Sequence, residues 1–134
     1  MKIVCDTNIL VSGFMYSGNE REIIRKISLG EVINFTSKEL LLEFASVIKR
    51  KKFKLNKDEQ RRILKFLIEI SEIVEPTKTI NIIKEDPADN RVIEVALESR
   101  SRYIISGDKH LLNLRKYKNI KILSAREFID ILEK

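Results

Sequence analysis

Four acidic residues stand where carboxylates interrupt apolar sequence. Asp6 follows the apolar run Ile3–Cys5 in MKIVCDTNIL, and Asp108 follows a similar run in YIISGDKHLL. Glu43 and Asp89 lie within segments of helical periodicity. Each acid has an ordinary explanation by itself, but carboxylates brought together raise one another's pKa unless cations are bound. Because oxygen ligands suit Mg²⁺ or Mn²⁺, the joint placement of the four predicts a divalent metal site.

Helical periodicity singles out Glu43 and Asp89 among the twenty acids of the chain. Glu43 lies at the margin of the apolar face of the 37–51 pattern, a position that is also common for an ion-paired glutamate. Asp89 lies in line with the buried stripe of the 89–100 pattern, whereas Glu94 points to the opposite side. An N-cap is the alternative explanation for Asp89, since its carboxylate would then accept backbone N–H groups.

Short β-branched runs alternate along the chain with longer amphipathic segments. The strand candidates are Lys2–Cys5, Val32–Phe35, Ile73–Val74, Tyr103–Ser106 and Lys121–Leu123. Helical patterns cover about 20–29, 37–51, 57–70, 89–100 and 125–133. This alternation predicts an α/β fold with a central, mainly parallel sheet of four to five strands. Parallel strands end at one edge of the sheet, and ligands bind there where the strand order reverses, so we expect the acids to meet at that edge.

Local signals mark where helices begin. Thr36 with Glu39, and Asn56 with Glu59, have the spacing of capping boxes. Asp86 precedes a proline and is explained as a turn residue at the entry to the next helix.

Length and composition indicate an ordinary globular protein. The 134 residues predict a single domain over 1–134, with 43% hydrophobic and 34% charged residues. Four Gly, two Pro and the lack of low-complexity sequence argue against disorder. No apolar run approaches the roughly 20 residues of a membrane span, and no signal peptide is recognisable. We therefore expect a cytoplasmic protein.

One cysteine and one histidine limit the possible chemistry. Cys5 alone excludes an intramolecular disulfide and a thiolate metal cluster, and we expect it to be a small buried hydrophobe. His110 alone leaves no usual base for a serine or cysteine nucleophile, unless His110 itself serves.

Positive charge is concentrated in one run. The net charge is +6, and the densest part of it comprises Lys49, Arg50, Lys51, Lys52 and Lys54. Such a run is usually a solvated helix end, but it also favours a polyanionic partner. Arg91, Lys109 and Arg115 lie nearer the acidic motifs. Within the run, we expect Phe53 to pack against the domain in preference to stacking on a base.

Four motifs resemble those of the PIN-domain nucleases in order and spacing: IVCDTNIL, ELLLEFASVIKRKKF, DPADNRVIEVAL and YIISGDKHLL. The closest branch is the small prokaryotic, VapC-like toxins of toxin–antitoxin systems, and the resemblance extends over essentially the whole chain. It implies a three-layer α/β/α domain that hydrolyses RNA phosphodiester bonds with one or two Mg²⁺ or Mn²⁺ ions.

The resemblance implies a role for each acid. Asp6 and Asp108 would be the principal metal ligands. Asp89 would complete the ligand set or hold a second ion, and Glu43 would bind metal or orient the attacking water. By the same resemblance, RNA is the partner, with contacts from the basic run and from Arg91 and Lys109.

Two polar residues complete the resemblance. Asn8 and Ser106 match positions that support the acidic cluster, and Ser106 keeps the hydroxyl of the threonine that the family often has there. Asn8 also argues against a haloacid-dehalogenase-like phosphatase, which expects a second aspartate two residues after the first.

The sequence alone is compatible with other roles. The same fold could serve an RNA-processing nuclease without a toxin role, a phosphate-receiver-like switch, or a non-catalytic RNA-binding PIN module. A non-catalytic module would be expected to lose acids, and all four are present. The toxin branch implies an antitoxin protein as partner, and the resemblance implies a homodimer, formed through surplus apolar helix surface.

Overall fold

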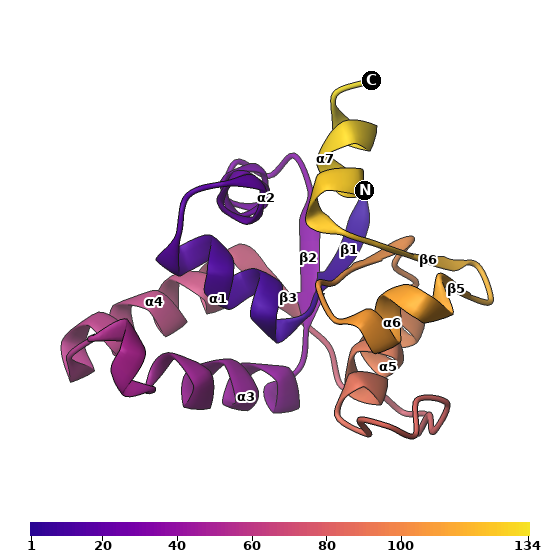
Figure 1. Ribbon diagram of the computed structural model, residues 1–134, viewed down its shortest axis with the longest axis horizontal. Helices are drawn as coiled ribbons and strands as arrows, with labels where there is room; N and C mark the ends of the chain where they lie inside the picture. Colours follow the sequence, from indigo (N-terminus) through magenta and orange to yellow (C-terminus); the bar gives the residue numbers. More distant parts are fainter.

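A mainly parallel sheet forms the middle of the molecule in the computed structural model, which describes residues 1–134 (Figure 1). The strands lie in the order β3-β2-β1-β4-β6-β5. Their bounds are Lys2–Cys5 (β1), Ile33–Thr36 (β2), Ser71–Ile73 (β3), Tyr103–Ile105 (β4), Lys116–Tyr117 (β5) and Ile120–Leu123 (β6). Neighbouring strands are parallel except for β5 with β6. The predicted α/β class is confirmed, with six strands because the short antiparallel β5 is added.

Seven helices cover the two faces of this sheet. They are Thr7–Met15 (α1), Asn19–Ser28 (α2), Lys38–Ile48 (α3), Lys57–Ile70 (α4), Asp89–Ser99 (α5), Lys109–Leu114 (α6) and Ala125–Leu132 (α7), with a 3₁₀ turn at Lys51–Phe53. Helices α1 to α4 and α7 pack on one face, and α5 and α6 pack on the other. The result is the three-layer arrangement that the sequence predicts. None of these helices combines the length and apolar character that crossing a bilayer demands.

The alternation of side chains along β1 explains why both faces are covered. Ile3 and Cys5 belong to the core beneath α1 to α4 and α7, whereas Val4 belongs to the core beneath α5 and α6. All three side chains are buried. A parallel strand buried on both faces reads as a continuous apolar run, as β1 and β4 do.

The strand order reverses between β1 and β4. The chain moves outward from β1 to β2 and β3, and then returns across β1 to place β4 on its other side. The two strands pair in parallel, with Cys5 opposite Ile105, and the amide of Asp6 donates to the carbonyl of Ile105 at 3.0 Å. Their carboxyl ends therefore open together, at the kind of crevice where α/β sheets bind ligands.

The helix starts follow the sequence signals with one correction. Asn56 and Glu59 form the predicted capping box of α4. The predicted cap at Thr36 is wrong, because Ser37 caps α3 by accepting from the amide of Leu40 at 3.3 Å. Thr36 instead pairs opposite Ile73 as the last residue of β2, where its β-branched side chain suits a strand.

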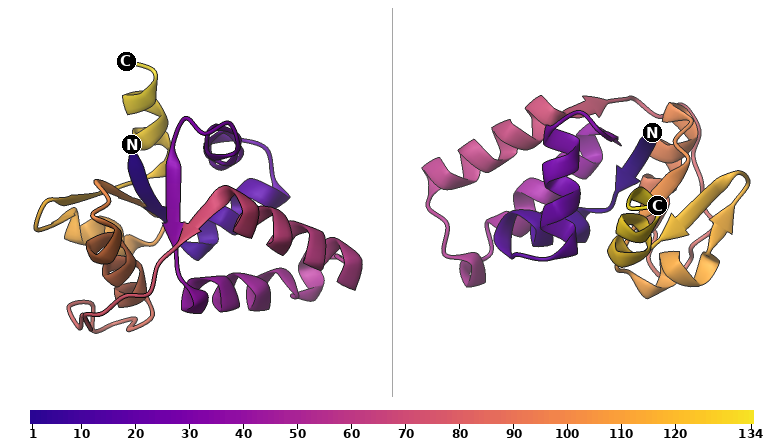
Figure 2. Two further views of the ribbon diagram at one scale, coloured as in Figure 1. Left: turned by 180° about the vertical axis from the view of Figure 1, so that it is seen from behind. Right: turned by 90° about the horizontal axis from the view of Figure 1, so that it is seen from above.

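Helices α3 and α4 form an antiparallel pair that extends away from the sheet (Figures 1 and 2). The basic run from Lys49 to Lys54 contains the turn that joins the two helices. Its cationic residues are all exposed. Phe53 packs against the core, as predicted, rather than projecting into solvent.

Candidate functional site

Two aspartates occupy the carboxyl ends of β1 and β4 and begin the helices that follow. Asp6 caps α1, and its Oδ1 accepts from the amide of Ile9 at 2.9 Å. Asp108 caps α6, and its Oδ1 accepts from the amide of His110 at 2.8 Å. Each carboxylate is therefore held by a strand end behind it and a helix start in front of it. The sequence predicts the place of both acids but not their capping role.

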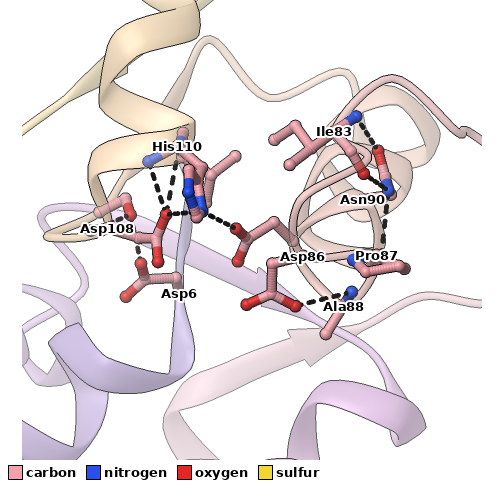
Figure 3. A network of polar contacts seen from close by, with 11 residues as sticks. Asp6, Ile83, Asp86, Pro87, Ala88, Asn90, Asp108 and His110 are labelled. Atoms are coloured by element: carbon pink, nitrogen blue, oxygen red, sulfur yellow. Dashed lines mark hydrogen bonds and ion pairs between the residues drawn. The ribbon is translucent and has the colours of Figure 1, made fainter.

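A buried hydroxyl links these two aspartates. Ser106 has no exposed surface; its Oγ donates to Oδ2 of Asp6 and accepts from the amide of Asp108 at 2.9 Å. Figure 3 shows Asp6 and Asp108 next to each other on one side of the cluster. Ser106 therefore ties the carboxylate of Asp6 to the backbone of Asp108.

Asp89 enters the site from α5. The alternative that Asp89 is an N-cap is wrong, because Ala88 occupies the N-cap position and Asp89 is the first helical residue. Its Oδ2 is buried and has no hydrogen-bond partner. Asp86 is the turn residue that the sequence predicts, since its Oδ1 accepts from the amide of Ala88 at 3.2 Å (Figure 3).

Asn90 is a positioning residue that sequence reasoning missed. Its Oδ1 accepts from the amides of Ile82 and Ile83, both at 2.9 Å, and its Nδ2 donates to the carbonyls of Ile83 and Pro87 (Figure 3). The side chain is 1% exposed. Because Asn90 ties the loop before α5 to the helix itself, it sets where Asp86 and Asp89 lie. A polar residue three positions before the buried Ile93 was the available signal.

A cleft of about 230 Å³ collects the predicted acids. Its lining residues include Asp6, Glu43, Asp89 and Asp108, together with Asn8, Thr7, Asp86 and Arg50. Glu43 and Asn8 are exposed, so they stand at the rim. The structure thus brings all four predicted acids and Asn8 to one cleft, while Ser106 lies buried beneath it.

Burial dominates the electrostatics of Asp6. Loss of solvent raises the pKa of its carboxyl to about 6, even though hydrogen bonds from Ser106 and Ile9 favour the ionised form. The charge of Asp108 contributes to the same rise in pKa. An ionised Asp6 therefore costs folding free energy in the absence of a cation.

Asp89 experiences the same environment with more neighbouring charge. Burial raises the pKa of Asp89 to about 7, and the charges of Asp108, Asp86 and Asp6 add to the effect. Asp86 thus acts on the site through its charge. A group of carboxylates whose ionised forms repel one another is stabilised by a bound cation.

His110 also reaches this cluster, which the sequence does not foresee. Its Nδ1 lies 3.6 Å from Oδ1 of Asp108 and 4.0 Å from Oδ2 of Asp89. The only signal in the sequence was its position two residues after Asp108.

The predicted basic residues do not share one environment. Arg50 lies just past the C-terminal end of α3 and lines the acidic cleft with Glu43 and Val47 of that helix. Arg91 is instead engaged elsewhere: its Nη2 lies 2.7 Å from Glu94 and donates to a loop carbonyl. Lys49, Lys51, Lys52, Lys54 and Lys109 are exposed.

Glu94 corrects a further prediction. The sequence places it on a solvated face of α5, but it is 8% exposed. The loop between β3 and α5 covers that face, and the amide of Ile80 donates to Glu94 at 2.9 Å. Glu94 is therefore buried by a loop outside its own helix, which the periodicity of α5 does not reveal.

Cys5 has the structural role that the sequence predicts. It is 1% exposed in the core of β1, and burial raises the pKa of its thiol far above the ordinary value. A protonated, inaccessible thiol is a poor nucleophile.

The residues at the cleft fit a divalent cation. Carboxylate oxygens are its preferred ligands. Two buried polar atoms of residues that line the cleft, Asp89 Oδ2 and Thr7 Oγ1, have no hydrogen-bond partner, and neither has Nδ1 of His110 beside Asp89 and Asp108. Buried polar atoms are normally paired, so these atoms indicate room for a ligand that the protein itself does not supply.

Comparisons with known proteins agree with the fold. The profile of the family described as PIN domain matches residues 2–110, a range that contains all four acids and His110. A relative from Methanocaldococcus jannaschii, named Uncharacterized protein MJ1680, is 33% identical over 146 residues. The alignment covers 100% of this chain and 93% of the relative.

Proposed function

The chain belongs to the PIN domain family, whose members are generally nucleases, and from this premise we propose that it is a metal-dependent endoribonuclease. The reaction is hydrolysis of RNA phosphodiester bonds. One observation carries the proposal: the cleft gathers Asp6, Glu43, Asp89 and Asp108 from four separate helices or their caps, at the point where the strand order reverses.

The acids of the cleft would hold one or two Mg²⁺ or Mn²⁺ ions. Asp6, Asp89 and Asp108 are the proposed ligands, and Glu43 either joins them or orients the attacking water. When bound here, a divalent cation would lower the pKa of a water molecule bound to it and would offset negative charge on the leaving oxygen. Ser106 links the carboxylate of Asp6 to the backbone amide of Asp108, which supports the placement of both residues at the cleft.

Metal dependence is tested with labelled single-stranded RNA. The purified protein is expected to cut the RNA with Mn²⁺ or Mg²⁺ and to stop when EDTA is added, because the acids alone would repel the phosphate. A DNA strand of the same sequence controls for the class of nucleic acid. Cutting that continues in EDTA would contradict the proposal. RNA that is bound but never cut would favour the non-catalytic RNA-binding module instead.

The basic run is proposed to bind the RNA backbone beside the cleft. Arg50 lines the cleft and Lys51 follows it at the start of the 3₁₀ turn. The double variant Arg50→Ala/Lys51→Ala is expected to weaken RNA binding roughly tenfold near 0.1 M salt, since each lost phosphate contact removes about 0.7 from the salt slope. Fluorescence anisotropy in an Asp108→Asn background measures binding without cutting.

A matched pair of lysines controls for net charge. Lys116 and Lys121 are exposed at the opposite edge of the sheet, on β5 and β6. Replacing both with alanine removes the same charge and is expected to leave the affinity nearly unchanged. Equal losses in the two double variants would show that only net charge matters, and would overturn the assignment of the basic run.

The toxin role is the finer part of the proposal and rests on the resemblance to VapC-like proteins. A toxin would stop growth when its expression is induced, the Asp6→Asn variant would not, and a cognate antitoxin protein would relieve the arrest. An RNA-processing nuclease would leave growth unaffected.

We also propose a homodimer, supported by apolar side chains exposed on α3 and α4, namely Leu42 at 61% and Phe66 at 41%. Light scattering after size exclusion decides this, and a monomer would contradict it.

A further inference from the structure

The side chain of His110 is built into the wall of the acidic cluster. Its backbone amide donates to Oδ1 of Asp108 at 2.8 Å, as part of the cap of α6, so the helix start fixes where the imidazole lies. Figure 3 shows the ring directed toward the carboxylates. His110 is the one histidine of the chain.

Nδ1 of His110 is too far from both acids for a hydrogen bond. His110 Nδ1 lies 3.6 Å from Asp108 Oδ1 and 4.0 Å from Asp89 Oδ2, both beyond the usual range of about 2.7–3.2 Å. His110 Nδ1 and Asp89 Oδ2 are nevertheless buried and unpaired. His110 Nδ1 and Asp89 Oδ2 thus lie near each other without a hydrogen bond, at a separation that allows both to ligate one ion.

A second observation points to a ligand at the same place. Thr7 is only 6% exposed and lines the cleft, and its Oγ1 has no hydrogen-bond partner either. Unpaired buried polar atoms are rare in folded proteins. Of the four in this protein, two belong to residues of the cleft, the third is His110 Nδ1 beside Asp89, and the fourth is Arg91 Nε on α5.

The separations match those of ligands to a single ion. Atoms from Asp89, Asp108 and His110 lie within 4.8 Å of one another. Two ligands on opposite sides of an ion bound at about 2.1 Å are about 4.2 Å apart, and neighbouring ligands are closer. The measured 3.6 and 4.0 Å therefore need little adjustment.

We propose that His110 is a nitrogen ligand of this metal site, through Nδ1, alongside Asp89 and Asp108. The inference rests on the proposed function and deepens it. Mg²⁺ prefers an all-oxygen shell, whereas imidazole increases the affinity for transition-metal ions. His110 thus gives the site a preference for a transition-metal ion such as Mn²⁺ over Mg²⁺.

Pulsed electron paramagnetic resonance of the full chain loaded with Mn²⁺ reads out the bond directly. Since the chain has one histidine, imidazole ¹⁴N modulation in protein without an affinity tag can come only from His110. The wild type is expected to show this modulation, and His110→Gln is expected to lose it. Isothermal titration should show that His110→Gln weakens Mn²⁺ binding roughly tenfold and Mg²⁺ binding much less. Asn113→Ala, at an exposed position on α6, is the control for disturbance of the helix.

The outcomes separate this inference from the proposed function. Wild-type protein that binds Mn²⁺ and cuts RNA without nitrogen modulation would overturn the role of His110 and leave the nuclease proposal standing. Wild-type protein that binds no Mn²⁺ would overturn both. The wild-type spectrum decides the question even if the variant fails to fold.

Discussion

Replacing Asp6 with asparagine is expected to slow RNA cleavage by roughly 1,000-fold, because metal-held charge stabilisation contributes several kcal/mol to such reactions. Asparagine keeps an oxygen that can accept from the amide of Ile9, so the cap of α1 survives. The same reasoning applies to Asp108→Asn, which keeps an acceptor for the amide of His110. The substitutions therefore remove charge while preserving the local fold.

Single-turnover cleavage of labelled RNA in excess Mn²⁺ measures this loss. Asp130→Asn removes a carboxylate from the exposed surface of α7 and should cut at the wild-type rate. Circular dichroism shows whether each variant is folded. If folded Asp6→Asn or Asp108→Asn cuts within tenfold of the wild type, the proposed ligands are not the site of the reaction.

Without metal, the Asp6→Asn variant is expected to be more stable than the wild type at pH 7.5. The pKa of Asp6 is raised to about 6 by burial, so the folded state holds this proton more tightly than the unfolded chain does. The resulting stabilisation is complete at low pH and is lost as pH rises through about 6. At about 1.36 kcal/mol per unit, the lost contribution amounts to up to roughly 3 kcal/mol.

Urea unfolding in EDTA between pH 4 and pH 7.5 measures the effect. The stability difference between Asp6→Asn and wild type reports Asp6 together with its charge interactions with Asp89 and Asp108, because groups outside the cluster contribute equally to both. It should grow in favour of the variant as pH rises, whereas Asp130→Asn should show no such trend. A wild type that stays as stable as Asp6→Asn at pH 7.5 would contradict a destabilising charge at this position.

Added Mn²⁺ should reverse the order. A ligand that binds only the folded state contributes about 4.1 kcal/mol at a concentration of 1,000 times its Kd, which exceeds the roughly 3 kcal/mol lost through the charge of Asp6. The wild type is expected to gain this stabilisation, and the Asp6→Asn variant to gain much less. The raised pKa values at Asp6 and Asp89 and the proposed metal binding would thus have one cause, the crowding of carboxylates in the cluster.

Elements with strong local signals could be predicted closely from the sequence. Strand β1 and helix α4 have the predicted bounds, because a continuous apolar run and a capping box define them. Strand β5 has two residues and presents no periodicity to detect. Thr36 and Ser37 both suit an N-cap, and only the pairing of Thr36 with Ile73 across the sheet decides between them.

The acids could be placed because the parallel sheet brings strand ends to one edge. That argument locates Asp6 and Asp108, and the helical pattern locates Glu43 and Asp89. Sequence reasoning assigned the N-cap alternative to Asp89, whereas Asp6 and Asp108 are the residues that cap helices. Which aspartate caps a helix depends on the backbone geometry where each strand ends, and the hydrophobic pattern of the sequence carries no information on that geometry.

The residues that sequence reasoning missed depend on contacts between distant segments. Glu94 is buried by the loop before α5, and Asn90 anchors that loop. His110 meets Asp89 only because α6 and α5 start at the same cleft. None of these relations has a fixed spacing in the sequence.

The central claim is that the acidic cleft binds a divalent cation, and anomalous diffraction tests it most directly. A crystal soaked in Mn²⁺ and measured at the manganese absorption edge reveals where the ion lies. We predict an anomalous peak inside the cleft, within coordination distance of Asp108 and of at least one of Asp6 and Asp89. A cleft without a peak at saturating Mn²⁺, or manganese bound only elsewhere on the protein, would contradict the claim.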